Sequence, residues 1–164
     1  MIVDLDTIRH LGEQNDDANF RFRTFLKSKD AKQLDKLVKE LFQFYSSKID
    51  CTKCGNCCTV LKPTIQTSDI KALAHIVKKS IQEFEREYLE TDEFGDLRFK
   101  DLPCPFLVDK KCSVYESRPE SCRSYPHLHK DHFSSRLIGV IQNYSICPIV
   151  FNVYEDLEHK FHFR

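Results

Sequence analysis

The sequence has little glycine, no surplus of charge of either sign and no long apolar run. Only 4 of its 164 residues are glycine, whereas 41% are hydrophobic and 30% are charged, which excludes collagen-like, low-complexity and disordered chains. Lys and Arg together number 25, as do Asp and Glu. This balance argues against a dedicated binder of nucleic acids or anionic membranes, because such proteins usually carry a basic surplus.

Signals for export, membrane insertion and nucleotide binding are also missing. The sequence MIVDLDTIRH at the N-terminus lacks the basic and apolar segments of a secretory signal, and nowhere do 18 apolar residues follow one another. We therefore expect a cytoplasmic protein that binds neither membranes nor nucleic acids. No G-x-G-x-x-G loop and no Ser-His-Asp order stands out, so the sequence names no substrate and leaves open whether the protein is an enzyme.

A helical pattern occupies the N-terminal third of the chain. From about residue 16 to residue 46, apolar residues recur at spacings of three and four, and charged residues fill the other face. Ser28 or Asp30 could begin a second helix within this range. We interpret residues 1–49 as an N-terminal helical segment that packs on the core. The alternative is a helix that binds a protein partner or pairs two copies of the chain.

Shorter elements are predicted further along. Asp69 suits the positive end of a helix, and Pro148 stands where a proline is common in the first turn. The pattern predicts helices at 67–79, at 81–89 and from 147 onward, and strands at 97–99 and 137–141. Residues 50–66, which are dense in Cys, are expected to form a loop. Residues 101–132, which are rich in Pro and Cys, are expected to form turns with one or two helical turns.

Eight cysteines are the outlier in this composition. Four lie in the motif CTKCGNCC, where two overlapping C-x-x-C spacings share Cys54 and can turn sulfur atoms toward one ion, and where Gly55 suits a tight turn. In a reducing compartment such clusters bind metals more often than they form disulfides. Four disulfides or redox-active thiols are the alternatives. We predict that all eight are metal ligands: Cys51, Cys54, Cys57, Cys58, Cys104, Cys112, Cys122 and Cys147.

Sets of four thiolates bind zinc or hold an iron–sulfur cluster. The C-x2-C-x2-C spacing followed by a distant Cys-Pro is similar to that of bacterial ferredoxins, which slightly favours an iron–sulfur cluster over zinc. On that analogy a first set would be Cys51, Cys54, Cys57 and Cys147, and a second set would be Cys58, Cys104, Cys112 and Cys122.

Three linked motifs carry a resemblance to a known family. CTKCGNCC, PCPFL and CSVYESRPESCRSYP, in this order, resemble the CxxCxxCC cysteine-cluster family, a YkgJ-type zinc- or iron-chelating domain, over about residues 50–148. The resemblance implies chelation of zinc, iron or an iron–sulfur centre by the eight cysteines. Some larger relatives resemble lysine N-methylases that act on flagellin with S-adenosylmethionine. An iron–sulfur-dependent redox or group-transfer enzyme, for example one similar to these methylases, is therefore the alternative function.

Several residues around Cys122 could support thiolates. Arg118 and Arg123 can offset their negative charge and donate hydrogen bonds, although ordinary salt bridges with nearby glutamates are the alternative. Tyr125 can donate to a sulfur atom or the backbone, or simply pack. A cluster of histidines that follows is interpreted as a solvated loop rather than a metal site: His127, His129 and His132.

Together these features predict a mainly α fold with a small irregular β component. We expect a single domain built around a Cys-rich metal-binding core, in which residues 50–164 form the chelating domain and end in a C-terminal helix.

Overall fold

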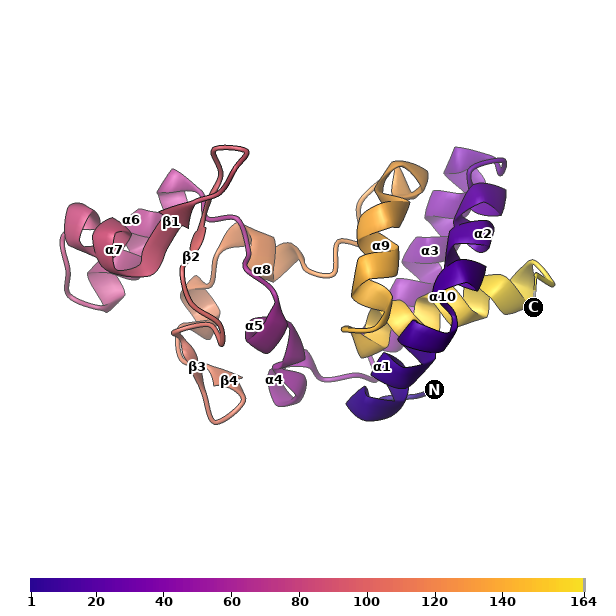
Figure 1. Ribbon diagram of the computed structural model, residues 1–164, viewed down its shortest axis with the longest axis horizontal. Helices are drawn as coiled ribbons and strands as arrows, with labels where there is room; N and C mark the ends of the chain where they lie inside the picture. Colours follow the sequence, from indigo (N-terminus) through magenta and orange to yellow (C-terminus); the bar gives the residue numbers. More distant parts are fainter. Residues whose placement is uncertain (164) are drawn as a thin grey trace. The chain divides into compact units, whose positions relative to one another are not determined.

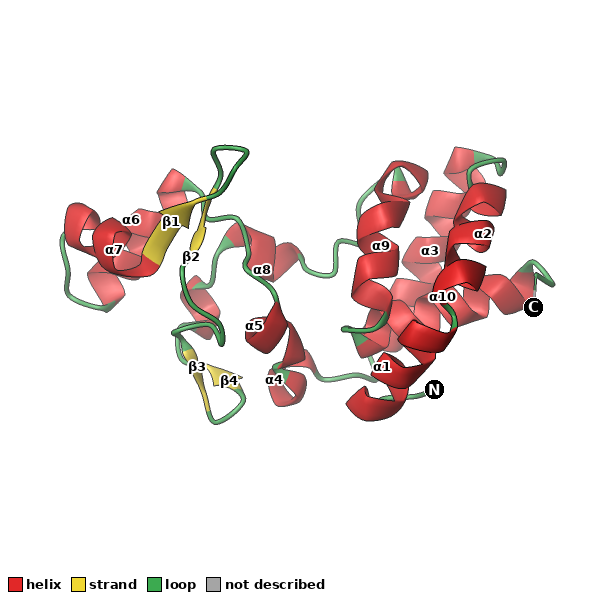
Figure 2. Ribbon diagram, in the orientation of Figure 1, coloured by secondary structure: helices red, strands yellow, loops and turns green. Residues whose placement is uncertain are grey.

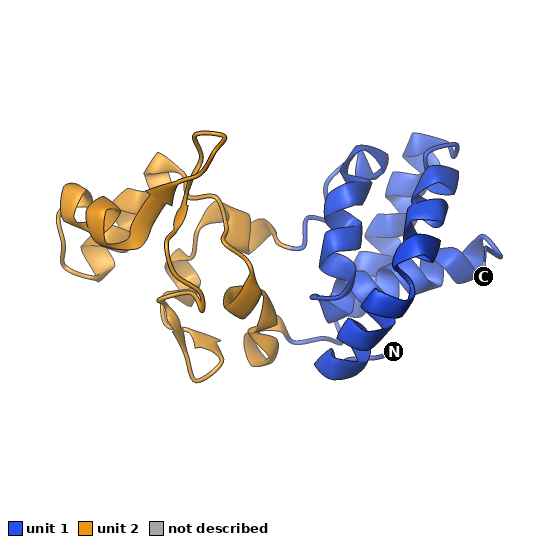
Figure 3. Ribbon diagram, in the orientation of Figure 1, with its two compact units in different colours: residues 1–50, 126–164 blue, residues 51–125 orange. Residues whose placement is uncertain are grey.

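The computed structural model describes residues 1–163, which are mainly helical, with 60% helix and 7% strand (Figures 1 and 2). This composition confirms the predicted fold class. The chain divides into two compact units (Figure 3): unit 1 comprises residues 1–50 and 126–164, and unit 2 comprises residues 51–125. The first break lies beside the boundary expected from the sequence. The second places residues 126–164 with the N-terminal helices, whereas the sequence pattern grouped them with the cysteines.

All the secondary-structure elements in the described residues of unit 1 are helices. Its elements are α1 (Leu5–Gln14), α2 (Asp16–Leu26), α3 (Ala31–Ser46), the 3-10 helix η2 (Phe133–Arg136), α9 (Leu137–Tyr144) and α10 (Pro148–Lys160). Helix α10 contacts α1, α3 and α9. Because neighbours cover it on several sides, nine of its thirteen residues are buried. This packing explains why the C-terminal helix belongs to unit 1.

Capping residues mark where these helices begin. The Asp30 carboxylate accepts a hydrogen bond from the Gln33 N–H at 2.8 Å, so the predicted start of a second helix at Asp30 is confirmed. Pro148 occupies the first turn of α10, as predicted. The apolar stripe of α3 is buried within unit 1. A role of this helix in binding a partner stays a prediction.

Polar groups tie the unit 1 helices together. The Tyr45 hydroxyl donates to Asp156 Oδ2 at 2.7 Å, and burial and this carboxylate raise the pKa of Tyr45. The Asp35 carboxylate accepts from the backbone N–H groups of His132 and Phe133, each at 2.8 Å. These bonds hold the start of η2 against α3.

One expectation for unit 1 was wrong, and one helix was not singled out. Residues 137–141 were predicted as a strand, but they belong to helix α9, where Leu137, Val140 and Ile141 are buried. Packing against the other helices therefore outweighs the intrinsic preference of these residues. Helix α1 was not predicted, although Asp4 caps it by accepting from the Thr7 N–H at 2.8 Å.

No single helix among residues 1–163 is long and apolar enough to cross a membrane. The segments Phe133–Tyr144 and Pro148–Lys160 meet the length and hydropathy required only as a pair bent by 120°.

Unit 2 combines short helices with two small antiparallel sheets. Its helices are α4 (Cys51–Cys54), α5 (Asn56–Val60), α6 (Thr67–Ile76), α7 (Ile81–Tyr88), η1 (Tyr115–Ser117) and α8 (Glu120–Ser124). Its strands are β1 (Leu89–Thr91), β2 (Leu97–Phe99), β3 (Leu107–Val108) and β4 (Lys111–Cys112). Strand β1 pairs with β2, and β3 pairs with β4 with Leu107 opposite Cys112.

A small apolar core lies between α6, α7 and these strands. Its buried members are Ile65, Ile70, Leu73, Ala74, Phe84, Leu89, Phe99, Phe106 and Val114. Cys104 and Cys112 pack against its edge. The core of unit 2 therefore borders the segments that carry the cysteines.

Two capping boxes begin the helices of this core. Asp69 is the third residue of α6 and accepts from the Gln66 N–H, and Glu83 has the same place in α7 and accepts from the Ser80 N–H. The predicted helix starts are thereby confirmed. The expectation of a loop over 50–66 was wrong in part, because α4 and α5 form there on either side of Gly55.

Candidate metal centre

Four cysteines of unit 2 come from four separate segments and lie in one neighbourhood. Cys58 is on α5, Cys104 precedes β3, Cys112 is on β4 and Cys122 is on α8. Each is partly buried, and the charges on these sulfur atoms act on one another. We call these four residues the thiol cluster. These residues are the same as those of the second predicted set, and whether they share one metal stays a prediction.

Burial disfavours the charged form of three thiols in this cluster. Burial raises the pKa of Cys104 to about 11 and that of Cys122 to about 12, and the charges of neighbouring thiols add to both shifts. The pKa of Cys112 is also raised, mainly by burial. Without a bound cation, these three side chains therefore keep their protons at neutral pH.

Cys58 behaves in the opposite way. A hydrogen bond from Cys57 lowers the pKa of Cys58 to about 7, against the effect of burial. The two sulfur atoms lie 4.0 Å apart. Cys58 is thus the thiol of the cluster that ionises first.

Backbone N–H groups point at two of the sulfur atoms. The Phe106 N–H donates to the Cys104 sulfur and the Val114 N–H donates to the Cys112 sulfur, and each bond favours the thiolate. In both cases the N–H donor belongs to the second residue after the cysteine. These donors were missed from the sequence, because only a turn after each cysteine places them there.

The chain approaches itself closely around the cluster. The Cys104 N–H donates to the Cys58 carbonyl at 2.7 Å. Gly55 separates α4 from α5 with a φ of +63°, and a Cβ atom there would lie 2.7 Å from the Lys110 carbonyl oxygen. Glycine is therefore required at this position, both for the backbone angle and for the contact with the β3–β4 turn.

Arg118 is the cation next to the cluster. Its charge lowers the pKa of Cys112 and Cys122 in opposition to burial. Its guanidinium lies 3.7 Å from the centroid of the Tyr115 ring and donates to the Tyr115 carbonyl at 2.7 Å. The backbone and the ring thus hold this positive charge in place beside the thiols.

The other two residues predicted to support thiolates have different surroundings. Arg123 donates to Glu120 Oε2 at 3.1 Å, and its Nη2 lies 3.8 Å from Asp69 Oδ1. Tyr125 follows α8 and is half-buried. A hydrogen bond from either residue to a thiolate stays a prediction.

The first predicted set of cysteines is divided between the two units. Cys51, Cys54 and Cys57 lie on α4 and α5 in unit 2, whereas Cys147 is buried at the start of α10 in unit 1. Whether these four share a site stays a prediction. None of the eight cysteines forms a disulfide in the described part of the chain.

Over residues 1–163, no three His, Cys, Asp or Glu side chains are within coordinating reach of one point. We therefore judge whether a metal could bind here from the kinds of ligand atoms present. Four thiols, two backbone N–H donors and one guanidinium provide the sulfur ligands and the charge compensation that a thiolate-bound metal requires. The donor types present are those that chelate zinc or iron.

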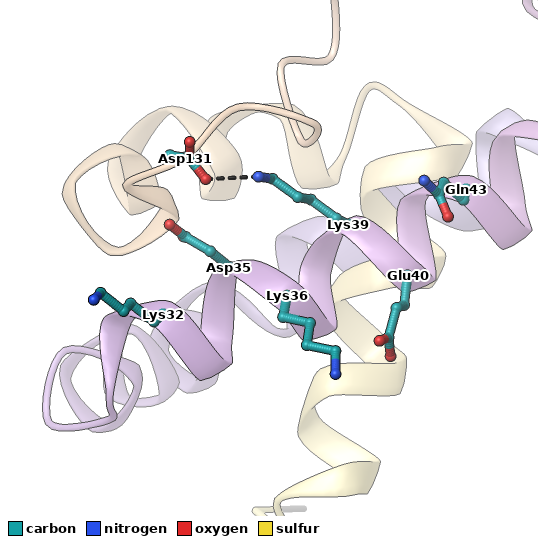
Figure 4. Close-up of a pocket in the computed structure, with 7 residues that line it drawn as sticks. All are labelled: Lys32, Asp35, Lys36, Lys39, Glu40, Gln43 and Asp131. Carbon is teal, nitrogen blue, oxygen red and sulfur yellow. Dashed lines mark hydrogen bonds and ion pairs between the residues drawn. The ribbon is translucent and has the colours of Figure 1, made fainter.

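Unit 1 contains a groove beside α3 with a different character (Figure 4). Charged side chains of both signs line it: Lys32, Asp35, Lys36, Lys39, Glu40 and Asp131, together with Gln43. Lys39 Nζ and Asp131 Oδ1 form an ion pair of 2.6 Å within it. In the adjacent histidine segment, the ring of His129 lies 5.8 Å from that of Phe42. No cysteine lines this groove, so it is not part of the candidate metal centre.

The fold and the cysteine arrangement of unit 2 define a thiol-cluster domain. Comparison with known proteins gives the family: residues 50–140 match the CxxCxxCC family, described as "Putative zinc- or iron-chelating domain". The match covers more than half of the chain, which therefore belongs to this family.

A curated relative is similar to part of the chain. The relative is an uncharacterized protein of Methanocaldococcus jannaschii, MJ0661, which is 33% identical over 101 residues. The alignment covers 58% of this chain and 54% of the relative, so the chain spans about half the length of that protein. No solved structure is similar to the chain at a significant level.

Proposed function

We propose that unit 2 is a metal-binding domain in which the thiol cluster holds a zinc or iron centre. The observation that carries this proposal is the presence of four thiols from four segments in one neighbourhood, next to Arg118. The pKa of three of these thiols is raised by burial. A bound cation would remove that penalty, because it stabilises the thiolate form.

The centre would serve first to stabilise the domain. A bound structural metal contributes on the order of 10 kcal/mol to folding, which is similar to the entire stability of many domains. Unit 2 has a small apolar core at one side of the cluster, and domains of this size often require an additional cross-link. Thiolates from α5, β4 and α8 would cross-link the segments outside that core.

Of the two metals, we favour iron in an iron–sulfur cluster. The cysteines of the first set, Cys51, Cys54 and Cys57 with Cys147-Pro148 later in the chain, have a spacing similar to that of bacterial ferredoxins. These cysteines are not members of the thiol cluster, so their spacing supports iron in the protein as a whole rather than at one set. A cluster would supply one-electron chemistry when bound. Zinc at the same thiolates would have a purely structural role.

The test is to purify the protein without oxygen, measure zinc, iron and acid-labile sulfide, and record the visible spectrum. Iron and sulfide in similar amounts with a brown colour support the iron–sulfur centre. Zinc without sulfide in a colourless protein supports chelation but contradicts the choice of iron. A metal-free protein that also takes up neither metal after reduction contradicts the whole proposal.

Two variants connect the metal to the thiol cluster. Cys58→Ser and Cys122→Ser each remove a sulfur from a different segment and should lower the metal content by one centre. His129→Ala is the control, since its ring lies beside Phe42, and it should keep the metal content of the unaltered protein. Full metal content in both cysteine variants would place the metal elsewhere.

A further inference from the structure

We infer that Asp69 is a positioning residue that holds Cys122 in place within the thiol cluster. The inference rests on the proposed metal-binding function. Asp69 lies in α6, outside the cysteine motifs, and its side chain is only 6% exposed. A carboxylate is costly to bury unless its oxygens are paired. The partners of this carboxylate therefore indicate what the residue does.

The two oxygens of Asp69 bind different segments of unit 2. Oδ2 accepts from the Gln66 N–H at 3.1 Å and closes the capping box of α6. Oδ1 accepts from the N–H of Glu120 at 3.2 Å. Glu120 is the first residue of α8 and lies 51 positions further along the chain. Asp69 therefore joins the beginnings of two helices, and one of these helices carries Cys122.

Helix α8 depends on groups outside itself. It has five residues, and the residue that precedes it, Pro119, provides no side-chain cap. The Asp69 carboxylate, which belongs to α6, caps α8 instead. It accepts a backbone N–H of α8 that has no partner within α8 itself. Cys122 is two residues beyond that N–H. A displacement at the start of α8 would therefore move its sulfur directly.

Further bonds hold the residues on both sides of Cys122. The Ser121 hydroxyl donates to the Thr64 carbonyl at 2.6 Å, which ties α8 to the segment before α6. Arg123 Nη1 donates to the Arg118 carbonyl at 2.5 Å, while its Nη2 lies 3.8 Å from Asp69 Oδ1. These bonds thus connect Asp69, through Arg123, to Arg118, whose charge acts on Cys112 and Cys122.

Glu83 provides a matched control for helix capping. It is the third residue of α7, and its Oε2 accepts from the Ser80 N–H at 2.9 Å and from the Ser80 hydroxyl at 2.6 Å. This capping box is exposed and local. If Asp69 acts only as a helix cap, loss of charge at either residue should have the same consequences.

The experiment compares Asp69→Asn with Glu83→Gln in the full chain. Cobalt(II) is added to the reduced, metal-free proteins in competition with a chelator, and its visible spectrum reports the thiolate ligands. Asp69→Asn should weaken cobalt binding by about 10- to 100-fold, the usual effect of losing a group that orients a ligand. It should also lower the sulfur-to-cobalt absorption per bound ion. Glu83→Gln should leave the affinity within about twofold.

Ser121→Ala provides a second, milder variant that removes one bond next to Cys122 and keeps the capping box of α6. It should weaken cobalt binding in the same direction even if Asp69→Asn does not fold. Affinity and absorption unchanged in both variants would overturn the inference while the metal function stands, as would an equal loss in Glu83→Gln. If the unaltered chain binds no cobalt, the proposed function fails, and the inference fails with it.

Discussion

The four thiols of the cluster differ in how readily each loses its proton. Burial raises the pKa of Cys104 to about 11 and of Cys122 to about 12, and it also raises the pKa of Cys112. The hydrogen bond from Cys57 lowers the pKa of Cys58 to about 7. At pH 8 a metal would therefore meet one thiolate and three thiols, and it must displace the remaining protons to bind all four sulfurs.

This difference predicts the pH dependence of metal binding. Above pH 7 about three protons should leave the cluster for each ion bound, and below pH 7 the number should approach four, because Cys58 is then also protonated. Since protons compete with the metal, the affinity should fall as the pH falls. Calorimetric titration with zinc in buffers of different ionisation enthalpy measures the number of protons. Release of one proton or fewer at pH 8 would contradict this description of the thiols.

Gly55 allows the turn between α4 and α5 to touch the β3–β4 turn. Gly55→Ala should lower the free energy of unfolding by about 3 kcal/mol and weaken metal binding, because the left-handed backbone and the 2.7 Å contact with the Lys110 carbonyl both oppose a side chain. Gly95→Ala is the control. Gly95 also has a positive φ, of +87°, but has open space around it.

Chemical denaturation and metal titration of the two glycine variants distinguish the effect of the left-handed backbone, which both positions share, from that of the Lys110 contact, which only Gly55 has. The backbone angle alone should cost Gly95→Ala about 1 kcal/mol, with metal affinity unchanged. If both variants lost the same stability and bound metal equally well, the close contact at Gly55 would have no importance for the site.

At the level of helices, close packing in unit 1 depends on another glycine. A Cβ atom at Gly12 of α1 would lie 2.5 Å from Ser145 Cβ and 3.2 Å from its Cα. Gly12→Ala should therefore destabilise the protein by about 1–3 kcal/mol, since the contact involves atoms close to the backbone. Gly139→Ala lies in α9 with no atom within 4 Å. It should increase stability by about 0.5–1 kcal/mol.

Thermal or denaturant unfolding of both variants checks this prediction, with helix content followed by circular dichroism. The change in stability should have opposite signs in the two variants. Helix propensity alone cannot give this result, because alanine favours a helix over glycine at both positions. A stabilised Gly12→Ala variant would mean that α1 does not pack on the Ser145 turn as described.

The sequence predicted elements best where a local signal begins a helix. Asp30, Asp69 and Pro148 each mark a helix start that the structure confirms. Prediction failed where neighbours decide the outcome. Residues 137–141 form a helix because unit 1 buries one of its faces. The β3–β4 hairpin has only two residues in each strand, too few for an alternating pattern.

In the candidate site, too, local sequence signals were predictive and contacts between distant segments were not. The analogy with bacterial ferredoxins grouped Cys58 with three downstream cysteines, and the charges of these four sulfur atoms act on one another in the structure. That they share one metal stays a prediction. The N–H donors of Phe106 and Val114 and the tie from Asp69 to Glu120 were not predicted. They depend on turns and on a contact between distant segments, which spacing alone does not encode.

At the scale of the whole chain, stability should be distributed unevenly between the two units. Unit 1 has its own apolar interior, including Phe22, Leu34, Phe151 and Tyr154. Seven of the eight cysteines lie in unit 2. Removal of the metal should therefore raise amide hydrogen exchange across residues 51–125, and should leave α2 and α3 largely protected.

Hydrogen exchange measured by mass spectrometry with and without chelator checks this, and restored metal should reverse the change. The Glu83→Gln variant should respond as the unaltered protein does, because its capping box is local to α7. A uniform rise in exchange over both units, or none in unit 2, would contradict the assignment of the metal to unit 2.

X-ray absorption at the zinc and iron edges tests the central claim most directly. The protein is purified without oxygen and measured beside Cys122→Ser. We predict a nearest shell of sulfur atoms at about 2.3 Å from the metal in the unaltered protein, and loss or incomplete occupancy of that shell in the variant. A shell of nitrogen and oxygen alone, or a sulfur shell unchanged in Cys122→Ser, would contradict metal binding by the thiol cluster.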